Sequence, residues 1–185
     1  MLYPMLVFLH VLGAMGVFAA FAIESVALRN LRSDETGRDV RASLKLFTLA
    51  SRMGMVSMIL LLGAGIALMV TVWHRQAWIS AAFVGIVMMA AVGGAVTARR
   101  LRSLRTSLAA TTASEPSSGV RQPLLGAGLS TALVVRIAIA VGIVGLMTAK
   151  PDLAGSALIL AGATVAGIVV SVPIGSRRPS SPRRA

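Results

Sequence analysis

Three ionisable side chains lie inside otherwise apolar runs of this sequence: His10, Glu24 and Arg136. Such groups are expensive to bury in hydrocarbon, so each one is a candidate for a functional site. His10 offers a ring nitrogen that can bind haem iron or another metal. Glu24 and Arg136 offer opposite charges. What each group can do depends on the segments that hold it.

The composition is that of a membrane protein. Of the 185 residues, 56% are hydrophobic and only 13% are charged, whereas soluble domains carry about 25% charged residues. A helix that crosses a ~30 Å hydrocarbon core needs ~20 apolar residues. We therefore predict one all-α membrane domain over residues 1–173, a polytopic transmembrane helix bundle. Its five predicted spans are at about residues 2–28, 53–72, 78–98, 131–149 and 153–172.

A bundle of four spans is the alternative, if the first helix is broken or is cleaved as a signal peptide. Signal peptides begin with a positively charged segment, and residues 1–9 carry no charge. The first apolar run is also longer than the hydrophobic region of a signal peptide. We therefore expect the first span to be retained.

The net charge of +12 is distributed in a way that predicts orientation. Basic residues gather between the first and second predicted spans, between the third and fourth, and after the fifth. The two remaining loops contain only Arg75 and Lys150. Because basic residues mark the cytoplasmic side, we expect the N-terminus outside and the C-terminus inside a bacterial cytoplasmic membrane. The excess charge would meet anionic lipids, and we expect no nucleic acid as partner.

Three segments outside the spans have patterns of their own. Residues 38–52 predict a cytoplasmic amphipathic helix that lies at the interface and continues into the second span. Residues 106–123 are rich in Ser, Thr, Ala, Pro and Gly, which predicts a flexible loop. Residues 174–185 predict a basic, disordered cytoplasmic tail.

The two loops predicted on the outer side are short. Trp73 and Trp78 bracket one of them, and because tryptophan prefers the membrane interface, both are expected to be interface anchors. Lys150, Pro151 and Asp152 form the other, an outer hairpin. Proline disfavours helix there, and Asp152 is expected to cap the fifth helix.

Counting along the helices places the polar groups relative to one another. The first span runs inward and the fourth outward, so Glu24 and Arg136 lie at similar depth. We expect an intramembrane charge pair, with snorkelling of Arg136 or a substrate or proton pathway as alternatives. His10 lies ~21 Å from Glu24 along the same helix and cannot join the pair.

His10 has two interpretations. One hydrogen bond to a neighbouring helix would satisfy a neutral imidazole in a packing role. Alternatively, His10 is an axial ligand of haem b, with His74 or a methionine within a span as the second ligand. The 10 methionines also suggest copper, but methionine is an ordinary filler of apolar packing.

The rest of the sequence offers little catalytic chemistry. There is no cysteine, which excludes disulfides, thiolate metal sites and cysteine nucleophiles. No nucleophile elbow, phosphate loop or His-Glu-x-x-His motif occurs. The sequence therefore favours a non-enzymatic protein.

Two motifs resemble known families. FLHVLGA, residues 8–14, resembles the first helix of small bacterial membrane proteins with an L-H-x-x-G-A signature. MTAKPDLAGS, residues 147–156, resembles the M-T-x-K-P-D-L-x-G-S segment of a family of predicted integral membrane proteins of unknown function. The similarity would cover residues 2 to about 172 and implies architecture only. The first helix is also distantly similar to that of copper-resistance D-type and HemJ-like membrane proteins, which implies a metal or haem role for His10.

Three functions remain open at this point. The first, which we favour, is a non-enzymatic membrane or accessory protein that acts with membrane lipids, with copies of itself or with a membrane protein partner. The second is a haem-binding redox protein with His10 as axial ligand. The third is a small cation or proton transporter that uses Glu24 and Arg136.

Overall fold

The computed structural model describes residues 2–33, 37–74, 76–94, 99 and 128–176. The prediction of an all-α fold is confirmed, because the regular structure within these residues is helical. The loop predicted at residues 106–123 lies outside the described residues. The elements are α1 (Leu2–Ser33), α2 (Gly37–Leu68), the π-helix η1 (Met69–Trp73), α3 (Ala77–Val92), α6 (Gly128–Ala149) and α7 (Leu153–Ser176).

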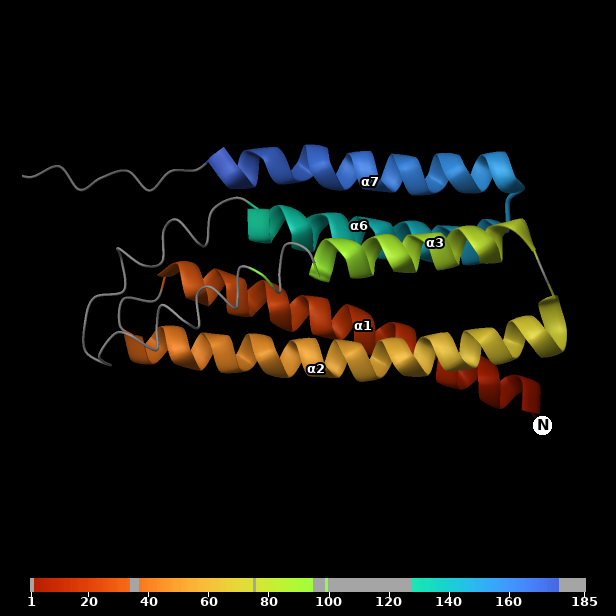
Figure 1. Ribbon diagram of the computed structural model, residues 1–185, viewed down its shortest axis with the longest axis horizontal. Helices are drawn as coiled ribbons and strands as arrows, with labels where there is room; N and C mark the ends of the chain where they lie inside the picture. Colours follow the sequence, from red (N-terminus) through yellow and green to blue (C-terminus); the bar gives the residue numbers. More distant parts are fainter. Residues whose placement is uncertain (1, 34–36, 75, 95–98, 100–127, 177–185) are drawn as a thin grey trace, which may run out of the picture.

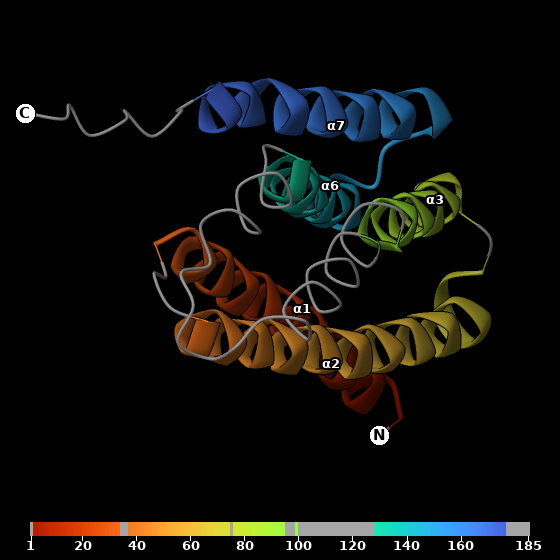
Figure 2. The same cartoon turned by 60° about the vertical axis from the view of Figure 1, so that its left-hand side comes forward.

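The helices pack in layers, which Figures 1 and 2 show from two directions. α1 and α2 form one antiparallel pair, α3 and α6 lie in the middle, and α7 covers α6 on the far side. The connections from α2 to α3 and from α6 to α7 lie at the same end of the bundle (Figure 1). We call this the turn end. We call the opposite end, where Arg29, Arg38 and Arg41 lie, the basic end.

Within the described ranges, four helical segments are long and apolar enough to cross a membrane: Leu2–Leu31, Arg38–Trp73, Gly128–Ala149 and Leu153–Val172. The chain is therefore a multi-pass membrane protein, with helices that match four of the predicted spans.

The third predicted span, residues 78–98, is described in part. Its α-helix, Ala77–Val92, has 16 residues and reaches ~24 Å, somewhat less than a ~30 Å hydrocarbon core. The helical backbone continues through Gly93 and Gly94 with π-helical geometry. Residues 95–98 lie outside the described residues, so the end of this span stays a prediction.

At the basic end, α1 and α2 extend beyond the spans predicted for them, because their apolar side chains pack against each other there. α1 continues to Ser33, beyond the predicted end near residue 28, and α2 is one continuous helix from Gly37. The apolar face predicted for residues 38–52 is buried inside the protein rather than lying on the membrane interface. The buried residues of this contact are Ala27, Leu28 and Leu31 of α1 and Val40, Leu44 and Phe47 of α2.

The C-terminal helix is also longer than predicted. α7 continues through Ser176, three residues into the tail predicted at 174–185. The rest of that predicted tail, residues 177–185, lies outside the described residues.

Small residues bring α1 and α2 into direct backbone contact near the turn end. A Cβ added at Gly13 would lie 2.7 Å from the backbone nitrogen of Leu61, and one added at Gly16 would lie 2.9 Å from Cβ of Ser57. Neither position has room for a side chain. This is the close approach that small residues permit between membrane helices.

Candidate functional site

His10 is held by a hydrogen bond that crosses from α1 to α2. Its Nδ1 lies 3.0 Å from the carbonyl oxygen of Leu61. His10 and Gly13 are three residues apart and therefore lie on one helix face. Because Gly13 packs directly on the backbone of Leu61, α1 comes close enough for the ring to reach that carbonyl.

Gly65 provides the space that the ring occupies. The Leu61 carbonyl also accepts the helical bond from the N–H four residues on, at Gly65, and its two lone pairs can serve both donors. A Cβ added at Gly65 would lie 3.1 Å from Cε1 and 3.2 Å from Nδ1 of His10. An alanine at this position would push against the ring.

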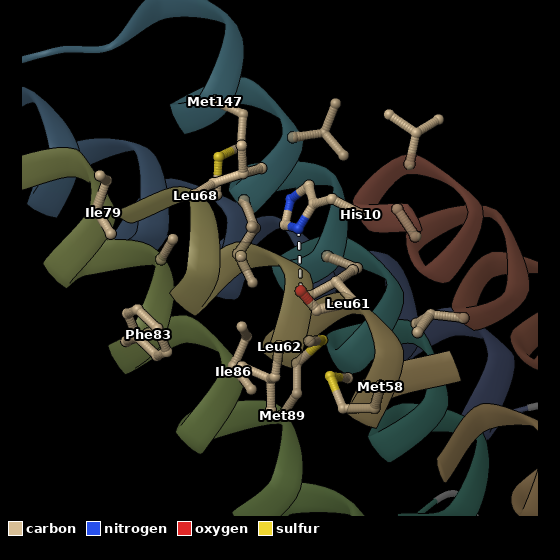
Figure 3. Close-up of a pocket in the computed structure, with 18 of the residues that line it drawn as sticks. His10, Met58, Leu61, Leu62, Leu68, Ile79, Phe83, Ile86, Met89 and Met147 are labelled. Carbon is tan, nitrogen blue, oxygen red and sulfur yellow. Dashed lines mark hydrogen bonds between the residues drawn. The ribbon is translucent and has the colours of Figure 1, made fainter. Parts of the chain in front are cut away.

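The bond to Leu61 decides which nitrogen of His10 carries the proton. A carbonyl oxygen only accepts, so Nδ1 must donate. In the neutral ring the other nitrogen, Nε2, then keeps a free lone pair. Within the described part of the chain, no group bonds to Nε2. Figure 3 shows Nε2 turned toward the side of the cavity where Leu68 and Met147 lie.

His10 forms part of the wall of a cavity of about 620 Å³ between the α1–α2 pair and the α3–α6 pair. Toward its N-terminus α1 crosses α2 and departs from α6 (Figures 1 and 2). Ligand pockets in proteins measure about 300–1,000 Å³. Among the described residues that line the cavity, His10 is the one ionisable side chain. The lining is rich in aromatic rings and sulfur: Met15, Phe18, Met58, Trp73, Trp78, Phe83, Met89 and Met147.

Trp73, Trp78 and Lys150 form a cluster at the turn end of the cavity, which we call the turn cap. The two indole rings meet edge to face with centroids 5.3 Å apart. Nζ of Lys150 lies 5.2 Å from the ring centroid of Trp73 and 5.9 Å from that of Trp78. The sequence placed both loops on one side but did not predict this cation–π contact.

The hairpin predicted at Lys150, Pro151 and Asp152 is present. Lys150 ends α6 in the left-handed region, with φ of 48°, and its N–H bonds to the carbonyl of Leu146 at 2.9 Å. Oδ1 of Asp152 accepts a hydrogen bond from the N–H of Gly155 at 2.8 Å. The prediction that Asp152 caps the last helix is therefore confirmed.

Glu24 and Arg136 form an ion pair that joins α1 to α6. Nη1 of Arg136 donates to Oε2 of Glu24 at 2.9 Å, and the two side chains are only 19% and 4% exposed. Cζ of Arg136 lies 4.9 Å from the ring centroid of Phe21. Nε of Arg136 is buried, and no hydrogen-bond partner for it occurs among the described residues. It faces the backbone of Gly93, where an added Cβ would be 3.4 Å away.

The structure does not bring His74 to His10. His74 is exposed, its N–H bonds to the carbonyl of Met69 at 2.7 Å, and its φ is 52°. It closes the turn after η1 and does not line the cavity, and neither do Glu24 and Arg136. In the ranges that the structure describes, no group of three or more His, Cys, Asp or Glu side chains is placed to hold a metal ion.

Comparison of the chain with protein-family models, with curated proteins and with solved structures finds no match. The resemblances based on residues 8–14 and 147–156 therefore rest on those motifs alone. The geometry gives both motifs a physical explanation. The histidine and glycine of FLHVLGA both contact Leu61, and the K-P-D of the second motif forms the turn between α6 and α7.

Proposed function

We propose that this protein is a non-enzymatic binding protein of a bacterial cytoplasmic membrane, which holds a lipid-soluble small molecule in the cavity around His10. The observation that carries the proposal is the combination of an apolar cavity of about 620 Å³ with one ionisable side chain, His10, among its described lining residues. Small-molecule sites are typically apolar, with a few polar groups that fix the orientation of the ligand.

The proposed orientation places the turn end outside and the basic end in the cytoplasm. It is supported by the concentration of arginines in the segments that join the spans at the basic end. The cavity would then lie in the outer half of the membrane. Aromatic residues prefer the interface, which agrees with the position of the turn cap.

The transporter hypothesis gains no support from the geometry. Glu24 and Arg136 face each other and are buried, and neither lines the cavity. Each charge offsets the desolvation of the other, as is usual for intramembrane charges with a structural role.

The proposal is tested by asking what the purified protein carries. Lipid-soluble molecules would be extracted from the detergent-purified protein and identified by mass spectrometry. Ala14 lines the cavity, so Ala14→Leu should displace the molecule by filling its space. Ala161 of α7 is exposed, and Ala161→Leu is the matched control. A molecule retained equally by all three proteins, or by none, would contradict the proposal.

A second candidate is a haem-binding redox protein with His10 as axial ligand. It is favoured by the Nδ1–H bond to Leu61, because ligating histidines are commonly oriented by such a bond to a carbonyl. Met147 lies on the side to which Nε2 turns and offers a thioether as the second ligand. Lys150 at the turn cap could pair with a propionate. Haem would supply one-electron transfer at its iron.

An absorption spectrum decides this second candidate. A Soret band in the oxidised and dithionite-reduced wild type that persists in His74→Ala and disappears in His10→Ala would support it. A colourless wild-type protein, after expression with ample haem, would contradict it.

A further inference from the structure

We infer that the cavity takes a lipid-soluble phenol or hydroquinone, whose hydroxyl group donates a hydrogen bond to Nε2 of His10. The inference rests on the proposed function, because it treats the cavity as a binding site. It adds the chemical class of the ligand.

The need for a donor follows from the tautomer. Leu61 accepts the proton of Nδ1 at 3.0 Å, so Nε2 presents only a lone pair. The lone pair of Nε2 repels a ligand group that also has only lone pairs, such as an ether or a quinone carbonyl. A hydroxyl group can instead donate a hydrogen bond to Nε2. A ligand oxygen placed at Nε2 therefore discriminates a hydroquinone from the corresponding quinone, although the two have nearly the same shape.

The aromatic character of the ligand follows from the wall. The cavity is lined by phenylalanine and tryptophan rings and by methionine sulfurs. Aromatic pairs favour offset or edge-to-face contacts, and sulfur makes favourable contacts with ring edges. Methionine side chains also adapt to irregular shapes, so a ring with an alkyl tail can be accommodated.

The charge of the ligand is limited by the same wall. His10 is the one ionisable side chain among the described lining residues, and its neutral tautomer carries no charge. A carboxylate or an ammonium group beside Nε2 would be buried without a partner of opposite charge, which is costly. Lys150 lies at the turn cap and is not among the lining residues. A phenolic hydroxyl is neutral and supplies the single donor that Nε2 requires.

The test compares two ligands that differ only at the oxygen, 4-octylphenol and 4-octylanisole, its methyl ether. The full-length protein in phosphatidylcholine nanodiscs would be titrated with each. The chain has 2 tryptophans, Trp73 and Trp78, and both line the cavity, so intrinsic fluorescence reports occupancy. One net hydrogen bond contributes about 0.5–1.5 kcal/mol. We therefore expect the phenol to bind about two- to twelvefold more tightly than the ether.

Two variants connect this preference to His10. In His10→Phe the ratio of the two affinities should fall to about one, because the acceptor is lost while an aromatic ring is kept. His74→Phe, at the exposed histidine, should keep the wild-type ratio. Equal affinities in the wild type, or an unchanged ratio in His10→Phe, would overturn the inference. Both results leave the proposed function standing, because the ligands still bind.

Failure of the proposed function has a different signature. If neither ligand changes the fluorescence of the wild type relative to the cavity-filled Ala14→Leu variant, there is no binding site and both proposals fail. A further comparison needs no variant at His10. An octyl hydroquinone should raise the unfolding temperature of the wild type more than its oxidised quinone does. An equal or larger effect of the quinone would overturn the inference.

Discussion

Helix α1 carries two intramembrane polar sites that the protein treats differently. Near the basic end, Glu24 is almost completely buried and bonds to Arg136 of α6 at 2.9 Å. Near the turn end, ~21 Å away along the same helix, His10 bonds to Leu61 of α2 through one nitrogen only. The first site joins two layers of the bundle. The second leaves an acceptor in the wall of a cavity.

The difference shows how to interpret polar residues in a membrane helix. Glu24 and Arg136 offset each other's burial, and their contribution is structural. For His10, the protein supplies a partner that fixes a proton on Nδ1, while Nε2 has no partner among the described residues. Both sites keep an unused polar atom, Nε of Arg136 and Nε2 of His10, but only His10 lines the cavity. What separates the two sites is therefore where the unused hydrogen-bonding capacity lies, and not the residue type.

The largest effect is expected at the ion pair. Glu24→Leu leaves the buried guanidinium of Arg136 without its partner and should lower the free energy of unfolding by about 3–5 kcal/mol. The measurement is an SDS-titration of reversible unfolding in mixed micelles. Glu24→Leu combined with Arg136→Leu should recover most of this loss, and Arg38→Leu, at an exposed arginine, should change little. A single and a double variant of equal stability would mean that the pair contributes nothing.

The next effect is at the contact that positions His10. Gly13→Ala forces a Cβ against the backbone of Leu61, and overpacking of this kind costs about 1–3 kcal/mol. Gly63→Ala on α2 is the matched control, because nothing lies within 4 Å of an added Cβ there. The same titration compares the two. Equal stability of both variants would contradict the close approach of α1 and α2.

A smaller effect on stability is expected at His10 itself. Interhelical hydrogen bonds in membranes contribute about 0.6 kcal/mol on average, so His10→Phe should be only slightly less stable than the wild type. It should nevertheless lose the preference for the phenol. A loss of stability as large as that of Glu24→Leu would make His10 a structural residue and remove the contrast between the two sites.

The smallest effect is expected at the turn cap. Lys150→Gln removes the cation that lies over Trp73 and Trp78 and should cost about 0.5 kcal/mol. The tryptophan emission maximum should shift, since both rings lose this neighbour. Lys45→Gln at the basic end is the control, because it changes the net charge by the same amount. The tryptophan emission spectrum of this variant should match that of the wild type. A Lys150→Gln spectrum identical to that of the wild type would exclude the contact.

The sequence predicted the features that depend on composition and spacing. The length of the apolar segments located four of the spans. Counting residues along the helices placed Glu24 and Arg136 at the same depth in the bundle. The aspartate at position 152 predicted the N-terminal cap of the last helix. For the third span the sequence predicted residues 78–98, of which residues 78–94 are described and helical. It assigned the apolar face of 38–52 to the interface, because one sequence does not show which helix covers that face.

The geometry around His10 could not be predicted. Its partner is a backbone carbonyl, and every residue has one, so no pattern marks Leu61. The role of Gly65 depends on the side from which the ring approaches. The cavity is lined by residues of five helical elements, and their relative placement depends on how whole helices cross. Predicting these features requires the three-dimensional arrangement of the helices, whereas predicting the charge pair required only a count of residues along each helix.

The most direct test of the central claim is the protonation of the His10 ring. In His74→Gln, His10 is the only histidine of the chain, and ¹⁵N NMR of histidine-labelled protein in nanodiscs reports each of its nitrogens. We predict a protonated Nδ1 and an unprotonated Nε2 at neutral pH, with the Nε2 resonance shifting when 4-octylphenol is added. A proton on Nε2, in either the other neutral tautomer or the charged ring, would contradict the account, because no acceptor would then face the cavity.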